Sequence, residues 1–186
     1  MIELSKIIVS GKDNFKFLQG QLTCDMTNIT ENSHHAALCD NKGRVLVSLQ
    51  VQKNHENFEI ILPTVMCTIF INALRKYAEF SDVSFSAPEI YSPPLDLLSS
   101  IRQKIAVILP ETSGKFTPHE LNYHELGFIS FTKGCYKGQE IIARMQYLGK
   151  LKKKLTHIIS PSSETIEGEV VNSIQTERNY EALVIL

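Results

Sequence analysis

The sequence predicts an α+β protein, because segments typical of strands and helices are mixed without the regular strand–helix–strand rhythm of a parallel α/β fold. Two observations support this fold class. A tight hairpin pattern surrounds the Asp-Asn-Lys-Gly stretch at 40–43, and short β-rich runs separated by polar residues fill 151–186. With 186 residues, of which 43% are hydrophobic, the chain can bury a sizeable core, as one domain or as a domain with a small appended module.

The first half of the chain is expected to form a sheet with two helices. Runs rich in β-formers predict strands at 2–9, 36–39, 45–51 and 58–62, and a short one around Val83 and Phe85. A short helix is expected at 13–18, closed by Gly20. The segment 64–78 is expected to be a helix packed on the sheet, since its apolar residues recur at near-helical spacing.

The second half is less regular. The segment 86–96 is rich in proline and is the best candidate for an internal junction. Strands are expected at 105–109 and 128–131, with a polar loop at 111–118 between them. A helix is expected at 138–148. The runs 155–159, 169–174 and 182–186 predict a small antiparallel sheet or partial barrel.

Composition excludes several classes of protein. The net charge of −1 gives no global basic field, so bulk electrostatics do not indicate a nucleic-acid coat protein or a membrane-surface binder. The four cysteines form no C-x-x-C pair and no histidine lies at zinc-knuckle spacing, so neither a metal site nor a disulfide framework is expected. No secretory signal or long apolar run is present, which predicts a cytoplasmic protein without a membrane partner.

The segment 131–140 carries the most informative local chemistry. Gly134 and Gly138 permit a tight turn or the close approach of a ligand, and a helix is expected to follow at once. Cys135 then lies just ahead of a helix N-terminus, between Lys133 and Lys137, and such surroundings favour the thiolate. The alternative is a small, inert cysteine in the core. Local sequence leaves both open.

Glu140 and Arg144 lie four residues apart on one face of this helix. They are either a solvated surface pair or a polar wall of a ligand site, with a carboxylate for an amidine-like edge and a guanidinium for an anion. His119 and His124 bracket a turn nearby and are acid–base candidates, although capping or packing is the simpler interpretation. Asp25 has the same two interpretations, as a proton acceptor or as a turn cap.

Residues 133–140, followed by Ala143 and Arg144, resemble the K-G-C-[YF]-x-G-Q-E…A-R signature of the YgfZ family, relatives of the glycine-cleavage T-protein. Three further segments are similar to family motifs: 17–25 (FLQGQLTCD), 39–46 (CDNKGRVL) and 116–122 (FTPHELN). The blocks stand in family order and cover most of 11–155.

The resemblance implies mixed sheets and packed helices around a central folate cavity, with a C-terminal β-barrel that is truncated here. It implies three regions: a folate-binding-type region at 1–86, a reduced middle region with the signature at 87–150, and a short barrel-like module at 151–186. The implied cofactor is tetrahydrofolate or a one-carbon derivative. The implied function is support of iron–sulfur cluster assembly or repair and, through it, tRNA modification, with iron–sulfur assembly or client proteins as partners.

Family positions carry over to this sequence residue by residue. The implied functional residue is Cys135. The implied folate-binding residues are Lys133, Gly134, Tyr136, Gly138, Gln139, Glu140, Arg144, Arg44, Gln21 and Asp25.

Two departures from the pattern restrict the function. The T-protein has its catalytic aspartate after the hairpin glycine, whereas 43–48 (GRVLVS) contains no carboxylate, so a classical aminomethyltransferase is not expected. Much of the usual middle region is missing between about 87 and 101. Two alternatives therefore stay open. One is a one-carbon transferase that uses Cys135. The other is an RNA- or protein-binding module with a decayed folate site, to which the lysines of 150–154 would contribute.

Overall fold

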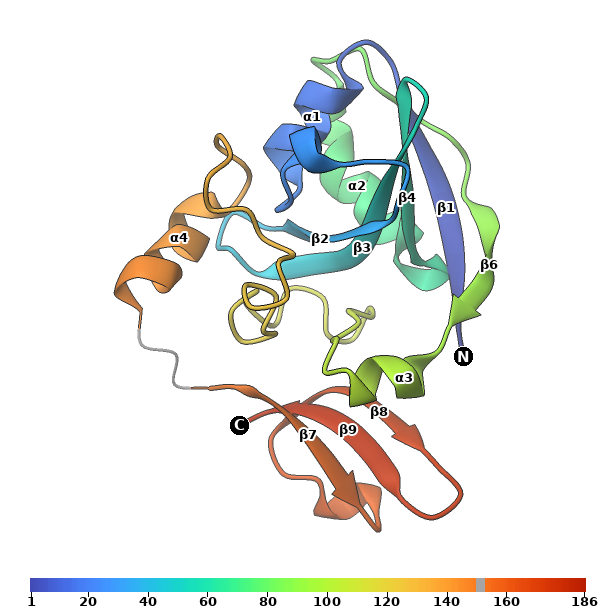
Figure 1. Cartoon of the computed structure of the whole chain (residues 1–186), viewed down its shortest axis with the longest axis vertical. Coiled ribbons are helices and arrows are strands. Elements are labelled where there is room, and N and C mark those ends of the chain that lie inside the picture. Colours follow the sequence, from blue (N-terminus) through green and yellow to red (C-terminus); the bar gives the residue numbers. More distant parts are fainter. Residues whose placement is uncertain (150–152) are drawn as a thin grey trace.

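The structure is a computed structural model that describes residues 1–149 and 153–186. Its described residues form a six-stranded and a three-stranded antiparallel sheet with helices packed around them, which confirms the α+β fold class (Figure 1). Every helix in the described part of the chain is too short or too polar to cross a bilayer.

The large sheet is built mainly from the first half of the chain. Its strands are β1 (Ile2–Ser10), β2 (His34–Cys39), β3 (Val45–Asn54), β4 (Asn57–Pro63), β5 (Ser84–Phe85) and β6 (Glu89–Leu95). The order is β2-β3-β4-β1, and β5 and β6 both pair with β1. Buried and half-buried residues alternate along most of β3, whereas β4 is buried from Phe58 to Pro63. A strand that is buried at every position has both faces covered.

Helices cover one face of this sheet. They are α1 (Asn14–Gln21) and α2 (Cys67–Ala78), and α2 is entered through a 3-10 turn at Thr64–Met66. Phe70 and Leu74 of α2 are fully buried, as the helical spacing predicts. On the other side lie α3 (Leu97–Arg102) and the C-terminal sheet (Figure 1). A second 3-10 turn, Met26–Asn28, follows α1, and α1 itself continues through Gly20 to Gln21 instead of closing at Gly20.

The segment 86–96, predicted as a junction, instead contains strand β6. This strand pairs with β1 from Lys6↔Glu89 to Ile2↔Leu95, and the register shifts between Ile2 and Leu4. Pro93 and Pro94 lie within β6 because only one side of an edge strand needs backbone donors. Proline therefore marks the edge of the sheet here.

Two predicted strands, 105–109 and 128–131, are irregular in the structure. Side chains satisfy some of their backbone groups in place of a neighbouring strand. Ser48 Oγ accepts from the Ile108 N–H at 2.9 Å, and Thr23 Oγ1 donates to the Phe128 carbonyl at 2.7 Å. Apolar β-formers thus predicted burial correctly and strand pairing wrongly, because side chains and separate backbone carbonyls take the place of a partner strand.

The C-terminal residues form the predicted small antiparallel sheet. Its strands are β7 (Leu155–Ser160), β8 (Glu169–Gln175) and β9 (Tyr180–Ile185), in the order β7-β9-β8, with a 3-10 turn at Ser163–Thr165. The inner side of β9 supplies Leu183 and Ile185 to the hydrophobic core that the large sheet also shares. The two sheets therefore belong to one packed body.

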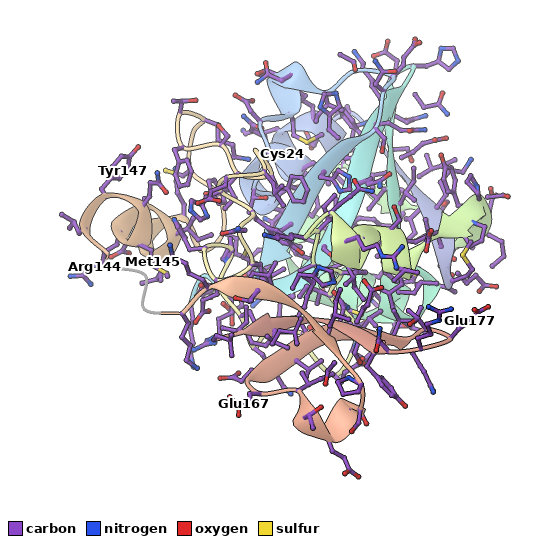
Figure 2. All side chains as sticks on the ribbon, turned by 60° about the horizontal axis from the view of Figure 1, so that its bottom comes forward. Cys24, Arg144, Met145, Tyr147, Glu167 and Glu177 are labelled. Carbon is purple, nitrogen blue, oxygen red and sulfur yellow. The ribbon has the colours of Figure 1, made fainter. Side chains whose placement is uncertain are left out.

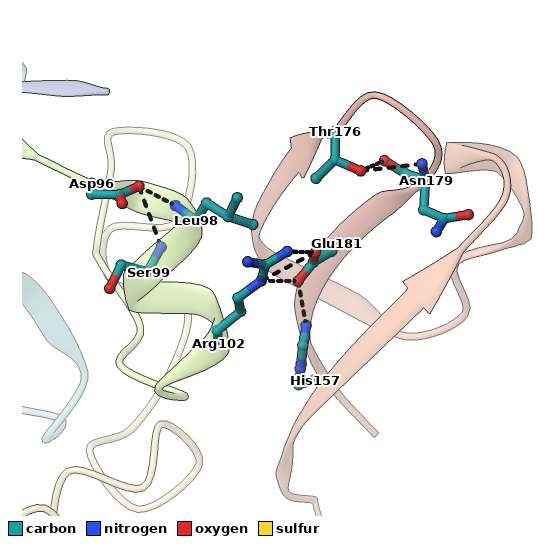
Figure 3. Close-up of polar contacts among 8 residues, drawn as sticks. All are labelled: Asp96, Leu98, Ser99, Arg102, His157, Thr176, Asn179 and Glu181. Carbon is teal, nitrogen blue, oxygen red and sulfur yellow. Dashed lines mark hydrogen bonds and ion pairs between the residues drawn. The ribbon is translucent and has the colours of Figure 1, made fainter.

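Polar side chains fix the C-terminal sheet to the rest of the molecule. The Asn172 amide donates to the Val107 carbonyl and accepts from the Val107 N–H, both at 2.8 Å. Arg102 of α3 donates to the buried Glu181 carboxylate at 2.5 Å, and His157 Nε2 lies 3.1 Å from the same carboxylate (Figure 3). The sheet thereby holds α3 and the irregular segment 105–109 in place.

Candidate functional site

Lys133 anchors the signature segment, residues 133–140, to the rest of the molecule. Its side chain is buried, and Nζ donates to the carbonyls of Gln19, Leu22 and Cys24 at 2.7, 2.6 and 2.7 Å. Burial lowers the pKa of Lys133 to about 8, while the three carbonyls favour the ammonium form. All three N–H groups of this ammonium have acceptors. Lys133 therefore ties the signature segment to the end of α1 and the turn that follows.

Gly138 packs directly against the 40–43 hairpin turn. It has a φ of +81°, and a Cβ there would lie 2.5 Å from the Asp40 carbonyl oxygen and 3.1 Å from Gly43 Cα. Gly43 in turn has a φ of +71°, and its added Cβ would lie 3.1 Å from Ile141 Cβ. Only glycine allows this approach. Two motifs that are almost a hundred residues apart in sequence, the 40–43 hairpin turn and the signature, thus meet in direct contact.

Cys135 lies exposed at the surface of the signature segment. Cys24, Cys39 and Cys67 are buried, and burial raises the pKa of all three thiols, that of Cys24 to about 11. The core-filling interpretation of Cys135 is therefore wrong. Open space also surrounds the neighbouring Gly134. Among the cysteines, Cys135 alone presents its sulfur to solvent.

Tyr136 points inward beside Cys135. Its side chain is buried, its ring centroid lies 4.7 Å from Lys133 Nζ, and burial raises the pKa of its phenol. The hydroxyl has no hydrogen-bond partner among the described residues. A buried phenol without a partner is costly, so this group is available to any acceptor that reaches it.

The predicted signature helix is confirmed as α4 (Gln139–Leu148), which projects from the body (Figure 2). Ile142 anchors it in the core, and Gln139 Oε1 accepts from the Tyr136 N–H at 3.4 Å. Within residues 1–149 no ion pair joins Glu140 to Arg144, and both side chains face solvent. This arrangement agrees with the solvated-surface interpretation of the two residues.

Two other predicted residues, Arg44 and Asp25, stabilise local structure. The Arg44 guanidinium donates to the Lys115 carbonyl. Asp25 Oδ1 accepts from the N–H and hydroxyl of Thr27 and from the Gln19 amide, and these bonds, the Thr27 N–H first, hold its pKa below the usual range. Asp25 is thus a turn cap. Gln21 differs, since its Oε1 atom is buried without a partner among the described residues.

A cavity of about 250 Å³, called the central cavity below, lies between the large sheet and the wall formed by α3 and 105–107. Leu49, Ile61 and Val107 line its apolar part. Its polar part includes Asp96 and Gln103. Asp96 Oδ1 caps α3 by accepting from the Leu98 and Ser99 N–H groups, and the described residues offer no hydrogen bond to the other oxygen, Oδ2. The cavity therefore combines apolar walls with the exposed carboxylate of Asp96, whose Oδ2 atom has no hydrogen-bond partner among the described residues.

An aromatic pair forms one end of this cavity. The rings of His35 and Phe128 stack with centroids 4.5 Å apart and an interplanar angle of 11°. Burial lowers the pKa of His35, so its imidazole is neutral at neutral pH. The pair also lines a second hollow of about 450 Å³ that includes Cys24 and Asp25. Cys135 lines neither of these two hollows within the described part of the chain.

The remaining candidates are packed or lie outside the described residues. The rings of His119 and His124 lie 4.7 Å apart, and His119 Nε2 is 3.1 Å from Gln146 Oε1. Burial lowers the pKa of His119, which suits the packing interpretation. In the lysine run, 150–152 lie outside the described residues, and Lys153 pairs with Glu169 at 2.6 Å. No group of three or more His, Cys, Asp or Glu side chains that could hold a metal ion occurs in the described ranges.

The residues that the sequence predicts to bind folate thus differ from the residues that line the central cavity. The signature residues and the 40–43 turn come together, as the motifs predict, but none of the ten predicted folate-binding residues lines the central cavity. Sequence reasoning missed His35, Asp96 and Gln103. A signal existed for Asp96, since an aspartate before Leu-Leu-Ser-Ser is a typical N-cap, but the nearby prolines indicated a junction instead.

Comparisons with known proteins agree with the resemblance. No family model matches the chain. The chain is similar to the tRNA-modifying protein YgfZ of Colwellia psychrerythraea, with 27% identity that covers 97% of this chain and 78% of the relative. The YgfZ of Klebsiella pneumoniae is also 27% identical, over 86% of this chain and 70% of its own. An uncharacterized protein of Haemophilus influenzae is 29% identical over 94% of this chain and 77% of its own.

A solved structure shows the same fold. The aminomethyltransferase T of the glycine cleavage system from Bartonella henselae superposes with a TM-score of 0.69 over 98% of this chain and 76% of that one, at 11% sequence identity. The Colwellia alignment runs over 251 residues, more than the 186 of this chain, so the relative has internal segments that are absent here. The chain is therefore similar over nearly its whole length to YgfZ proteins, lacks internal segments that the Colwellia relative has, and shares the fold of the glycine-cleavage T-protein.

Proposed function

We propose that this protein binds a tetrahydrofolate in the central cavity and serves as an accessory factor in iron–sulfur cluster assembly or repair and, through it, in tRNA modification. One observation carries the proposal. A cavity with apolar walls, a stacked aromatic pair and a free carboxylate oxygen lies inside a fold of the T-protein type. Concave sites with few, convergent polar groups are typical of small-molecule binding.

The lining suits the pterin end of a folate. A pterin presents an amidine-like edge with two N–H donors, and a carboxylate such as that of Asp96 accepts from such an edge. The Gln103 amide offers both a donor and an acceptor to the remaining ring atoms. The neutral His35 ring, stacked on Phe128, gives a flat surface at one end. At about 250 Å³ the cavity is smaller than a typical ligand site of ~300–1,000 Å³, so it would enclose the ring end of the ligand alone.

The thiol would act elsewhere in the same function. Cys135 is exposed, and it lies outside the lining of the central cavity. An exposed sulfur is accessible to a protein partner, such as an iron–sulfur assembly or client protein. The start of β3, Val45-Leu46-Val47-Ser48, contains no carboxylate, which supports an accessory function in preference to aminomethyl transfer.

Calorimetric titration with tetrahydrofolate under anaerobic conditions tests the proposal. Asp96→Asn is the informative variant, because asparagine caps a helix as well as aspartate does but lacks the carboxylate charge. We expect saturable binding to the wild type and about tenfold weaker binding to this variant, as for the loss of one charged hydrogen bond. Asp25→Asn is the matched control, since it makes the same change in a turn cap outside the central cavity.

Two results would contradict the proposal. One is the absence of heat at high tetrahydrofolate concentration. The other is an equal or greater effect of Asp25→Asn, which would move the site to the second hollow. Thiol labelling separates the one-carbon transferase alternative: tetrahydrofolate would protect Cys135 if the ligand reached the thiol, and would leave its labelling unchanged in an accessory protein.

A further inference from the structure

A third hollow, of about 330 Å³, lies on the outer side of the helices. It is lined by Lys16, Phe17 and Gln21 of α1 and by Tyr77 and Phe80 at the end of α2. It has no lining residue in common with the central cavity. A ligand here would therefore contact none of the residues that line the central cavity.

The signature segment reaches the rim of this hollow. The Lys137 N–H donates to the Gly20 carbonyl at 3.1 Å, and Lys137 Nζ lies 5.0 Å from the centroid of the Tyr77 ring. Lys76 Nζ lies 4.8 Å from the same ring. Two ammonium groups therefore lie over the Tyr77 ring at the edge of the hollow. One of them belongs to Lys137, which follows the exposed Cys135 by two residues.

Positive charge is in slight excess around the hollow. Lys16, Lys76 and Lys137 belong to it or to its rim. On the acidic side, Asp13 Oδ2 is engaged by the Asp82 N–H at 2.8 Å, and the Asp82 carboxylate pairs with Lys12 at 3.7 Å. Glu79 is exposed beside the rim. With Lys12 included, four lysines lie near three carboxylates, and this excess of one positive charge favours an anionic ligand.

The lining of the hollow also includes an exposed aromatic ring, that of Phe80, and the side-chain amide of Gln21. Phe80 is 90% exposed, the most exposed of the large apolar side chains of the described residues. Gln21 Oε1 is buried without a hydrogen-bond partner in the described part of the chain. An amide presents one donor and one acceptor side by side, which matches the edge of a purine base. A bare aromatic ring gives such a base a surface to stack on.

We propose that this hollow binds a nucleotide, with the phosphate at Lys137 and Lys16, the base against Phe80, and the Gln21 amide at the edge of the base. A simple anion would use the lysines and leave the aromatic ring exposed. An acidic peptide would gain little from a flat ring and a free amide edge. The combination of cation, flat ring and amide is the chemistry of a nucleotide, either free or as one unit of a single-stranded RNA.

Binding titrations of the full chain test the inference, with AMP followed by calorimetry and with fluorescein-labelled single-stranded oligoadenylate followed by anisotropy. We expect Phe80→Ala to weaken binding about tenfold through loss of stacking, and Lys137→Gln to weaken it about fivefold and to reduce its salt dependence. Matched controls are Ile159→Ala and Lys154→Gln, which remove an exposed apolar side chain and an exposed ammonium at the C-terminal sheet, a region that contributes no lining residue to the hollow. Both should bind like the wild type. Thermal melts confirm that each variant is folded.

The outcomes separate the sources of the nucleotide. Equal affinity for AMP and oligoadenylate would identify a free nucleotide, whereas binding of the oligomer alone would identify RNA; both support the inference. Equal binding of inorganic phosphate, tighter binding of p-aminobenzoylglutamate than of AMP, or wild-type affinity in both hollow variants would overturn it. Tetrahydrofolate binding in the central cavity is measured separately with Asp96→Asn, so either proposal can fail without the other.

Discussion

The central cavity and the signature segment are built in opposite ways. The central cavity is lined by residues from distant parts of the chain, with a carboxylate and an aromatic pair but no thiol. The signature segment is formed by one short stretch of chain that presents a thiol at an open surface. The proposed folate site and the exposed thiol thus have separate locations in this fold. Each region can therefore be changed while the other serves as an internal control.

The largest expected effect concerns thiol accessibility. In the native protein Cys135 should react with a thiol reagent at pH 7.5 roughly a hundredfold or more faster than Cys24, Cys39 or Cys67, because these are buried and their pKa values are raised. Mass spectrometry of peptides from briefly labelled protein gives the four rates. Denatured protein is the control, since all four should then react alike. Rapid native labelling of a second cysteine would show that the core around the signature segment opens.

The next effect concerns the ammonium beneath the signature segment. Lys133→Met should lower the free energy of unfolding by about 3 kcal/mol or more, because three buried carbonyls lose their shared donor. Urea denaturation measures this change. Lys137→Met is the matched control and should cost less than about 1 kcal/mol, the value of one exposed cation–π contact. Similar losses in the two variants would mean that Lys133 does not stabilise the signature segment.

Asn172 stabilises the wall of the central cavity, as Lys133 stabilises the signature segment. Asn172→Ala removes the partners of both backbone groups of Val107, which lines the cavity, and should cost about 2 kcal/mol of stability. It should also weaken tetrahydrofolate binding while leaving Cys135 labelling unchanged. Asn179→Ala is the control, because the Asn179 contacts with Thr176 use its backbone groups (Figure 3). Unchanged affinity in Asn172→Ala would separate the C-terminal sheet from the cavity.

The smallest effect is a pH dependence at the junction of α3 and the C-terminal sheet. Hydrogen bonds from Arg102 hold the pKa of Glu181 below its usual value of 4.5. The stabilisation is therefore complete above the unfolded-state pKa and is lost as the pH falls through the folded value. Glu181→Gln should lower the melting temperature by about 1–2 °C at pH 7, and the difference should shrink as the pH falls below the usual glutamate pKa of 4.5. A constant difference across this range would mean that the carboxylate charge is irrelevant.

Sequence reasoning performed best where structure is determined locally. The hairpin around 40–43, the helix at 139–148 and the C-terminal strands follow from turn residues and apolar periodicity. It failed for 86–96 and 105–109, because a proline-rich edge strand and a coil bonded to Ser48 and Asn172 depend on neighbours that no local pattern specifies. Both segments contribute to the central cavity or stand beside it. The cavity was therefore the part of the site that motifs could not reveal.

The sequence predicts the turn and helix of the signature segment correctly, but it does not predict the directions of the side chains. Spacing indicated a turn, a thiol and a helix, and these are present. Spacing could not show that Lys133 points inward to three carbonyls while Cys135, two residues later, points outward. The direction of a side chain in an irregular turn depends on tertiary contacts, which the sequence does not state.

The strand order β7-β9-β8 has a consequence for how the protein is made. The central strand of this sheet is the last of the three to leave the ribosome, so β7 and β8 have no partner until β9 has emerged. Val107, synthesised long before, receives its contacts from Asn172 only when that sheet assembles. The wall of the cavity is thus completed after translation of β9. A nascent chain stalled before that point carries the finished signature segment but an open pocket.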